Sequence, residues 1–119
     1  MAGLLTAAYE PSESDRDIKK IKSALDRGAN INYQDAYSWT PLMYAAYGGY
    51  PHIASYLISK GARKDIVDTK SSWRGYNAKG IAEYYLNRYQ NSQINCKPDM
   101  VEFYKEKVEV YSTLKNLLS

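Results

Sequence analysis

The clearest pattern of apolar and polar positions lies in the middle of the chain, between residues 40 and 62. Apolar residues recur there at helical spacing in two short blocks, which predicts two short helices packed back to back. Thr40 and Pro41 supply an N-cap and a proline at the first helical position, where its missing N–H costs nothing. Gly49 and Gly61 are placed to end the two helices, since glycine tolerates the left-handed conformation at a helix C-terminus. The predicted buried positions are Leu42, Ala45, Ala46, Ile53, Leu57 and Ile58.

This segment, TPLMYAAYGGYPHIASYLISKGA, resembles one ankyrin repeat, whose family signature includes T-P-L-H-x-A at a period of 33 residues. Three positions depart from the family pattern. Met43 replaces the histidine of the motif, so the hydrogen bonding that this histidine supplies is expected to be absent. Ser38 stands where a glycine is expected, and Tyr50 replaces the histidine that follows Gly49. The resemblance implies an all-α solenoid of about three helix-turn-helix units, joined by short hairpin-like fingers.

Weaker copies of this unit are expected on both sides. Gly28 and Gly61 lie 33 residues apart, and Asp35 and Asp68 are separated by the same distance along the chain. The first copy matches the family at LLTAA, residues 4–8, and lacks the TPL motif, as terminal repeats often do. Its second helix is expected to begin near Ser14 or Asp15, where acidic residues favour the positive end of the helix dipole.

The third copy is degenerate and longer. It carries about four extra residues, in the segment SSWRGY, before a helix that is expected to run to about Gln90. The following residues, 91–99, read as a linker. A broad apolar stripe over residues 100–118 then predicts a long helix that must bury against something, and the expected target is the open face of the third unit.

The chain is therefore predicted to be one ankyrin-repeat domain over residues 1–119. Residues 1–32 form an N-terminal capping repeat and residues 33–65 the central repeat. Residues 66–119 form the degenerate repeat with a C-terminal capping helix. About three such units are needed before stacked repeats bury enough apolar surface to be stable.

Composition places few further restrictions on the protein. Charged residues make up 24% and hydrophobic ones 45%, as in ordinary soluble domains. No apolar run approaches the length that spans a bilayer, so no membrane partner is expected. The first ten residues lack the basic leader of a secretory signal, and the single cysteine allows no internal disulfide. We expect a cytoplasmic protein, or a periplasmic or secreted one if a signal has been removed.

Residues suited to catalysis or metal binding are sparse. His52 is the only histidine and Cys96 the only cysteine, and more than one repeat separates them along the chain. A structural zinc site requires four nitrogen or sulfur ligands, and no glycine-rich phosphate loop is present. We therefore expect a protein that is not an enzyme and that holds neither a metal nor a cofactor.

Two local features point to recognition instead. Residues 60–79 contain six basic and two acidic side chains, a net charge of +4, so that the rest of the chain carries −1 of the total of +3. Such a local field steers association with an acidic partner. Nucleic acid is disfavoured as the partner, because the patch is small and no base-reading element is present. Tyrosine is also abundant, with 13 copies against a single phenylalanine, and it suits half-buried recognition surfaces.

The family resemblance implies that the binding surface lies at the finger tips and on the first helix of each unit. Aromatic and basic residues gather at those positions, and such residues dominate interface hot spots. The candidate partner-binding residues are Tyr37, Trp39, Tyr47, Lys70, Trp73, Arg74, Tyr76, Tyr84 and Tyr85. Among these, Trp39 is the one whose ring is most expected to pack on the base of its finger.

The predicted function is therefore non-catalytic binding of another protein, for which the basic patch suggests an acidic surface, and a monomer is favoured. Two alternatives stay open. The chain could be an inhibitor or immunity-type protein that neutralises one enzyme or toxin, or a self-assembling structural subunit that uses its C-terminal helix.

Overall fold

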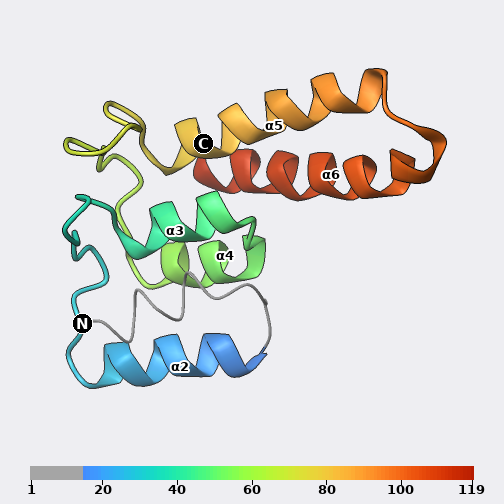
Figure 1. The fold of residues 1–119 in the computed structure, drawn as a ribbon. Helices are drawn as coiled ribbons and strands as arrows, with labels where there is room; N and C mark the ends of the chain where they lie inside the picture. The colour runs from blue at the N-terminus through green and yellow to red at the C-terminus, as the bar shows by residue number, and fades with distance from the viewer. Residues whose placement is uncertain (1–14) are drawn as a thin grey trace.

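The structure is a computed structural model, and it describes residues 15–119 of the chain (Figure 1). The helices in this part are α2 (Asp15–Asp26), α3 (Pro41–Gly48), α4 (Pro51–Ser59), α5 (Ala78–Ile94), the 3-10 helix η1 (Pro98–Met100) and α6 (Val101–Leu118). Within these residues no strand forms, and an isolated bridge pairs Asp68 with Arg74. The predicted all-α class is confirmed. The helix expected at residues 4–8 lies outside the described residues.

The central repeat forms as its end signals predict. The Thr40 hydroxyl accepts a hydrogen bond from the backbone N–H of Met43 at 3.3 Å, and Pro41 opens α3. Gly49 ends this helix at a φ of +77°, in the left-handed region. Met43 is not as inert as we expected, because its sulfur accepts a weak hydrogen bond from the Thr40 N–H at 3.5 Å. Met43 thus still provides one hydrogen-bond acceptor at the position where the family has a histidine, while its side chain is buried in the core.

The helices stack in three tiers, with α5 and α6 above α3 and α4, and α2 below (Figure 1). Helix α3 packs against α4 and α5, while α4 also contacts α2 and α6. One continuous core runs through all the tiers. Its fully buried large side chains include Ile21, Leu42, Met43, Ile53, Leu57, Ile81 and Leu114. Small residues at Ala45, Ala46 and Ala82 allow neighbouring helices to approach closely.

The third tier differs from the sequence prediction in the length of α5 and agrees with it in the packing of α6 on the third unit. Helix α5 continues to Ile94, past the expected end at Gln90, so Asn91–Ile94 belong to the helix rather than to a linker. Helix α6 lies alongside α5 and also contacts α4, which is the place of a second helix within the unit. The pair α5–α6 extends past the ends of α3 and α4 (Figure 1).

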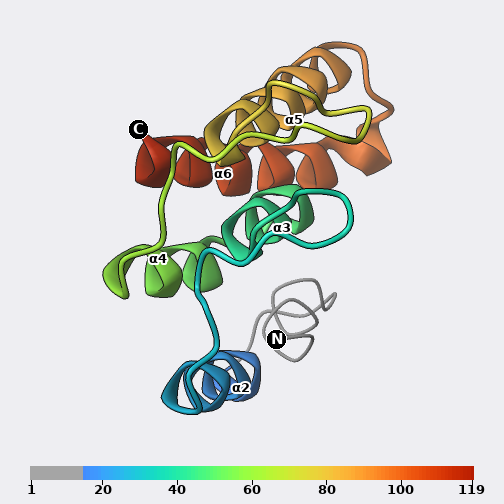
Figure 2. The same cartoon turned by 90° about the vertical axis from the view of Figure 1, so that its left-hand side faces the viewer.

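The first finger comprises residues 35–40 and the second finger residues 68–77. The two fingers protrude on the same side of the molecule, one above the other (Figure 2). Each finger leads into the first helix of the next unit, α3 or α5. The expected hairpin-like shape is present without strands, because each finger closes through a few backbone hydrogen bonds near its base. In the first finger, the Asp35 N–H donates to the Trp39 carbonyl at 3.0 Å. In the second, the Asp68 N–H donates to the Tyr76 carbonyl at 3.0 Å. No helix in the described part of the chain is long and apolar enough to cross a membrane.

Candidate functional site

Five aromatic side chains from three separate elements form one cluster, here called the aromatic face. It comprises Tyr47 on α3, Trp73 and Tyr76 on the second finger, and Tyr84 and Tyr85 on α5. Trp73 lies at its centre, with ring centroids 5.0 Å from Tyr84, 5.2 Å from Tyr76, 5.7 Å from Tyr85 and 6.2 Å from Tyr47. Most of these pairs meet edge to face, which is a favoured geometry for aromatic rings.

The rings of this face are packed against one another and still open to solvent. Tyr76 and Tyr84 are exposed, and Tyr47, Trp73 and Tyr85 are half-buried. Burial, with the neighbouring Tyr47, raises the pKa of Tyr85 to about 12. The phenol is neutral at physiological pH, as that of an ordinary tyrosine with a pKa of about 10 also is. A surface of preorganised, uncharged aromatic side chains can bury a large contact area at little cost in side-chain entropy.

Local signals place each of these rings. The second finger spans Asp68 to Asn77, four residues longer than the equivalent stretch from Asp35 to Thr40, and these extra residues include Trp73. Gly75 adopts a φ of +81°, and its N–H donates to the Asp68 carbonyl at 2.8 Å, which closes the loop. The side chain of Asn77 then caps α5 by accepting from the Gly80 N–H at 2.8 Å. The cap starts α5 in the register that places Tyr84 and Tyr85 beside the loop.

Trp39 supports the aromatic face from beneath and contributes little surface of its own. Its ring is only 5% exposed and lies 5.4 Å from Tyr47 and 6.4 Å from Trp73, measured between ring centroids. Its indole N–H donates to the carboxylate of Asp68 at 2.9 Å. Tyr37, in contrast to Trp39, is largely exposed: it lies at the tip of the first finger and is 62% exposed. Its backbone N–H donates to the side chain of Asp35, which shapes that turn.

Basic side chains flank the aromatic face. Lys70 and Arg74 are exposed on the same finger as Trp73, and Arg88 follows Tyr84 by one turn of α5, with its guanidinium 3.5 Å from the Tyr84 hydroxyl. None of the three forms an ion pair with another described side chain. By contrast, Arg63 and Asp65 form an exposed ion pair at 2.7 Å and largely cancel each other. Of the positive charge predicted for residues 60–79, Lys70 and Arg74 lie on the finger that carries Trp73, and Arg88 adds a further cation from α5.

Sequence reasoning overlooked the buried polar residues under this surface. Asp68 was noted only for its spacing from Asp35, yet its side chain is 1% exposed and accepts several hydrogen bonds. Burial alone would raise its pKa, but the bonds from Ser71, Trp39 and Lys70 outweigh that effect and hold the pKa of Asp68 well below its usual range. The sequence carried one signal of these buried polar contacts, which is Ser38 at the position where the family has a glycine.

The aromatic contacts also extend further than predicted, from the aromatic face along α5 to α6. Tyr85 lies 5.4 Å from Tyr111 and 6.3 Å from Tyr89, measured between ring centroids, and Tyr89 in turn approaches Phe103 at 6.5 Å. The Tyr111 hydroxyl donates to the Tyr47 carbonyl at 3.1 Å, which ties α6 to α3. Helix α6 therefore supports the aromatic face from behind.

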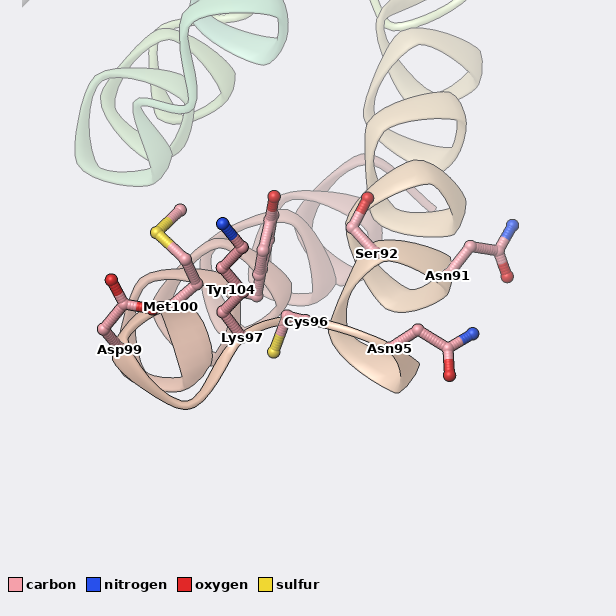
Figure 3. A pocket seen from close by; sticks show the side chains of 8 residues that line it. All are labelled: Asn91, Ser92, Asn95, Cys96, Lys97, Asp99, Met100 and Tyr104. Atoms are coloured by element: carbon pink, nitrogen blue, oxygen red, sulfur yellow. The ribbon is translucent and has the colours of Figure 1, made fainter.

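A hollow with a volume of about 600 Å³ lies at the end of the α5–α6 pair that is farthest from the aromatic face. Figure 3 shows that Asn91 and Asn95 point to one side of it, while Asp99 and Met100 point to the other. Its lining side chains therefore do not converge on one point, as a ligand site requires. Cys96 lines this hollow, whereas His52 lines another one between α4 and α6. Among the described residues, no group of His, Cys, Asp or Glu is arranged to hold a metal ion.

Comparison with known proteins identifies the repeats. Residues 4–58 match the family described as ankyrin repeats (many copies). Residues 4–58 of this chain are therefore ankyrin repeats. Ankyrin repeats generally mediate protein–protein interactions. The match covers the first two units, whereas the enlarged finger and the α5–α6 pair lie outside it.

Individual relatives share the repeats over part of their length. A human protein, "Protein phosphatase 1 regulatory subunit 27", is 41% identical over 62 residues, which are 52% of this chain and 40% of the relative. A "Putative ankyrin repeat protein" of Rickettsia bellii is 29% identical over 87 residues, 70% of this chain and 25% of the relative. The mouse "Ankyrin repeat, SAM and basic leucine zipper domain-containing protein 1" is 41% identical over 46 residues, 39% of this chain and 10% of the relative. The chain thus spans less than half the length of these relatives.

Proposed function

We propose that this ankyrin domain binds one partner protein through the aromatic face, with the flanking cations directed at acidic groups of the partner, and that it carries out no chemistry itself. The observation that carries the proposal is the solvent exposure of interlocked rings around Trp73. A ring cluster on a rigid base has the composition of an interface hot spot.

Charge supports an acidic partner over a cationic one. Aromatic rings also attract cations through their negative faces. Here, however, Lys70, Arg74 and Arg88 surround the rings, and the nearby Asp68 is buried and saturated with hydrogen bonds. A cationic ligand would therefore meet like charge at the rim, whereas carboxylates of an acidic partner would be attracted and oriented.

Burial of the C-terminal part of α6 supports binding over self-assembly through this helix. In that part of the apolar stripe Tyr111, Leu114 and Leu118 are buried inside the chain, whereas Val101 and Phe103 near the start of the helix are exposed. We therefore propose a monomer. Neutralisation of one enzyme or toxin is the finer form of the binding proposal, and the human relative that shares these repeats is named as a regulatory subunit of an enzyme.

A matched pair of tyrosines tests the site. Tyr84 and Tyr33 are nearly equally exposed, at 40% and 38%, but only Tyr84 belongs to the aromatic face. In a pull-down from an extract of the source cells, Tyr84→Ala should lose the captured protein, since loss of a hot-spot side chain costs about 2 kcal/mol or more. Tyr33→Ala should retain it. Equal capture by both variants would show that the aromatic face does not bind the partner.

A second pair tests the role of charge. Arg74→Glu reverses a charge beside Trp73, and Lys105→Glu makes the same change in net charge on the exposed side of α6. We expect Arg74→Glu to slow association and to reduce its dependence on salt concentration, because rim charges act mainly on the association rate. Equal effects of the two variants would indicate that only the net charge of the protein matters.

A further inference from the structure

The second finger is anchored at both ends by one residue, Asp68. Its backbone N–H donates to the Tyr76 carbonyl at 3.0 Å, and its own carbonyl accepts from the Gly75 N–H at 2.8 Å. One oxygen of its carboxylate accepts from the backbone N–H groups of Lys70 at 2.7 Å and Ser71 at 2.8 Å. The loop that carries Trp73 is therefore closed around a single side chain, which is itself 1% exposed.

The same carboxylate reaches across to the first finger. Its Oδ1 atom accepts from the Ser38 hydroxyl at 3.0 Å, and its Oδ2 atom accepts from the indole N–H of Trp39 at 2.9 Å and from the Ser71 hydroxyl. The Ser38 hydroxyl oxygen in turn accepts from the backbone N–H of Thr69 at 2.8 Å. With Lys70, six residues from two fingers are thus joined in one polar network around the buried carboxylate.

Ser38 occupies an unusual backbone conformation within this network. Its φ is +65°, in the left-handed region that favours glycine, and it is the single non-glycine residue with a positive φ in the described part of the chain. Such a conformation persists only where the surroundings over-determine it, and it occurs most often at functional sites. The serine therefore accepts backbone strain in a position where its hydroxyl joins the two fingers.

We infer that Ser38, Trp39 and Asp68 form a latch that holds the second finger in its binding-competent shape before a partner arrives, and that Asp68 is thus a positioning residue for the aromatic face. The inference rests on the proposed function of that face. The latch sets the place of the Trp39 ring, which supports both Tyr47 and Trp73. It also sets the path of the loop that carries Trp73 and Tyr76. A loop that is already ordered loses less entropy on binding, so the latch raises affinity without touching the partner.

Two substitutions separate the latch from general stability. Ser38→Gly removes the bridging hydroxyl but suits the positive φ, so the backbone itself is relieved of strain. Asp68→Asn keeps the size of the side chain, yet its amide N–H₂ would face donors where Oδ2 now accepts. Ser72→Ala serves as the control, because Ser72 is exposed on the same finger and forms none of these bonds. Thermal unfolding by circular dichroism checks that each variant is folded.

The direct measurement is hydrogen exchange by NMR on the free chain, without any partner. Ser38→Gly should speed exchange of the Thr69 amide about tenfold, and Asp68→Asn should do the same for the indole N–H of Trp39, since each loses its buried acceptor. Helical amides of α3 and α5, and all sites in Ser72→Ala, should keep their wild-type rates. Unchanged exchange at Thr69 and Trp39 in the two variants would overturn the latch. If Asp68→Asn does not fold, Ser38→Gly decides alone.

Capture of the partner completes the test. Folded latch variants should bind the protein captured by the wild-type chain about tenfold more weakly. Faster exchange with undiminished capture would overturn the positioning role of Asp68. The proposed function has a separate criterion, because Trp73→Ala removes the centre of the aromatic face and leaves the three latch residues in place. If Trp73→Ala captures the partner normally, the aromatic face is not the binding surface. The latch is then tested by the hydrogen-exchange rates alone.

Discussion

Helix α6 should be essential for cooperative folding, although it lies outside the recognised repeats. Cutting the chain after Asn95 removes η1 and α6 at an exposed turn. The lost helix buries Tyr111, Leu114 and Leu118. At about 1.5–3 kcal/mol for each fully buried side chain, the cut removes about 5–9 kcal/mol of apolar stabilisation. The total stability of a small domain is about 5–15 kcal/mol, so little would remain.

The assay is urea unfolding followed by far-UV circular dichroism. The truncated chain should show a shallow, gradual loss of helix in place of a sharp transition, because its remaining tiers bury too little surface. Leu114→Ala gives a milder version in the full chain. Its side chain is fully buried, and such truncations cost about 2–5 kcal/mol. The control, Glu106→Ala on the exposed side of α6, should change stability by no more than about 0.5 kcal/mol.

One result would refute this reasoning. If the chain cut after Asn95 unfolds sharply and with a stability close to that of the full chain, the first two tiers fold on their own. Helix α6 would then be an accessory that covers α5 without holding the domain together. The truncated chain could also unfold sharply while Leu114→Ala strongly destabilises the full chain. That result would show that α6 is not required for folding, and that a poorly packed α6 destabilises the domain.

Three further predictions concern backbone strain and pH. Gly61→Ala, at a φ of +94° with open space around it, should cost about 1–2 kcal/mol in chemical denaturation. Gly49→Ala should cost more than that, because its new methyl group would also lie 3.2 Å from the Tyr111 hydroxyl oxygen. The pKa of Asp68 is depressed in the folded chain, so the contribution of this carboxylate to stability is complete above the pKa of about 3.9 that it has in the unfolded chain. That contribution is lost as the pH falls below this value. Stability measured from pH 5 downward should therefore decline less steeply in Asp68→Asn. In alkali, the pKa of Tyr85 is raised to about 12 and its neutral form is favoured in the folded chain, so stability should fall as the pH rises past about 10, and Tyr85→Phe should flatten that decline.

The sequence alone determined the features that depend on local chemistry. The start and end of α3 follow from Thr40, Pro41 and Gly49, because each residue acts on the backbone of its own turn. The 33-residue spacing of Asp35 and Asp68 determined the register of the two fingers. Most of the candidate site followed from this register, since the positions that a finger and a first helix present are known once the repeat is aligned.

Only the tertiary structure decided how α6 is used and what lies beneath the rings. The apolar stripe and the repeat order predicted that α6 packs on the third unit, but its additional contact with α4 of the central unit could not be read from the chain. The burial of the Trp39 ring was predicted, but the partner of its indole N–H was not, because the carboxylate that accepts this hydrogen bond lies 29 residues further along the chain. Contacts of that kind depend on how two fingers stack. Periodicity and capping carry no information about them, because those signals act within a few residues, whereas the pairing of Ser38 and Trp39 with Asp68 exists only after the units have packed.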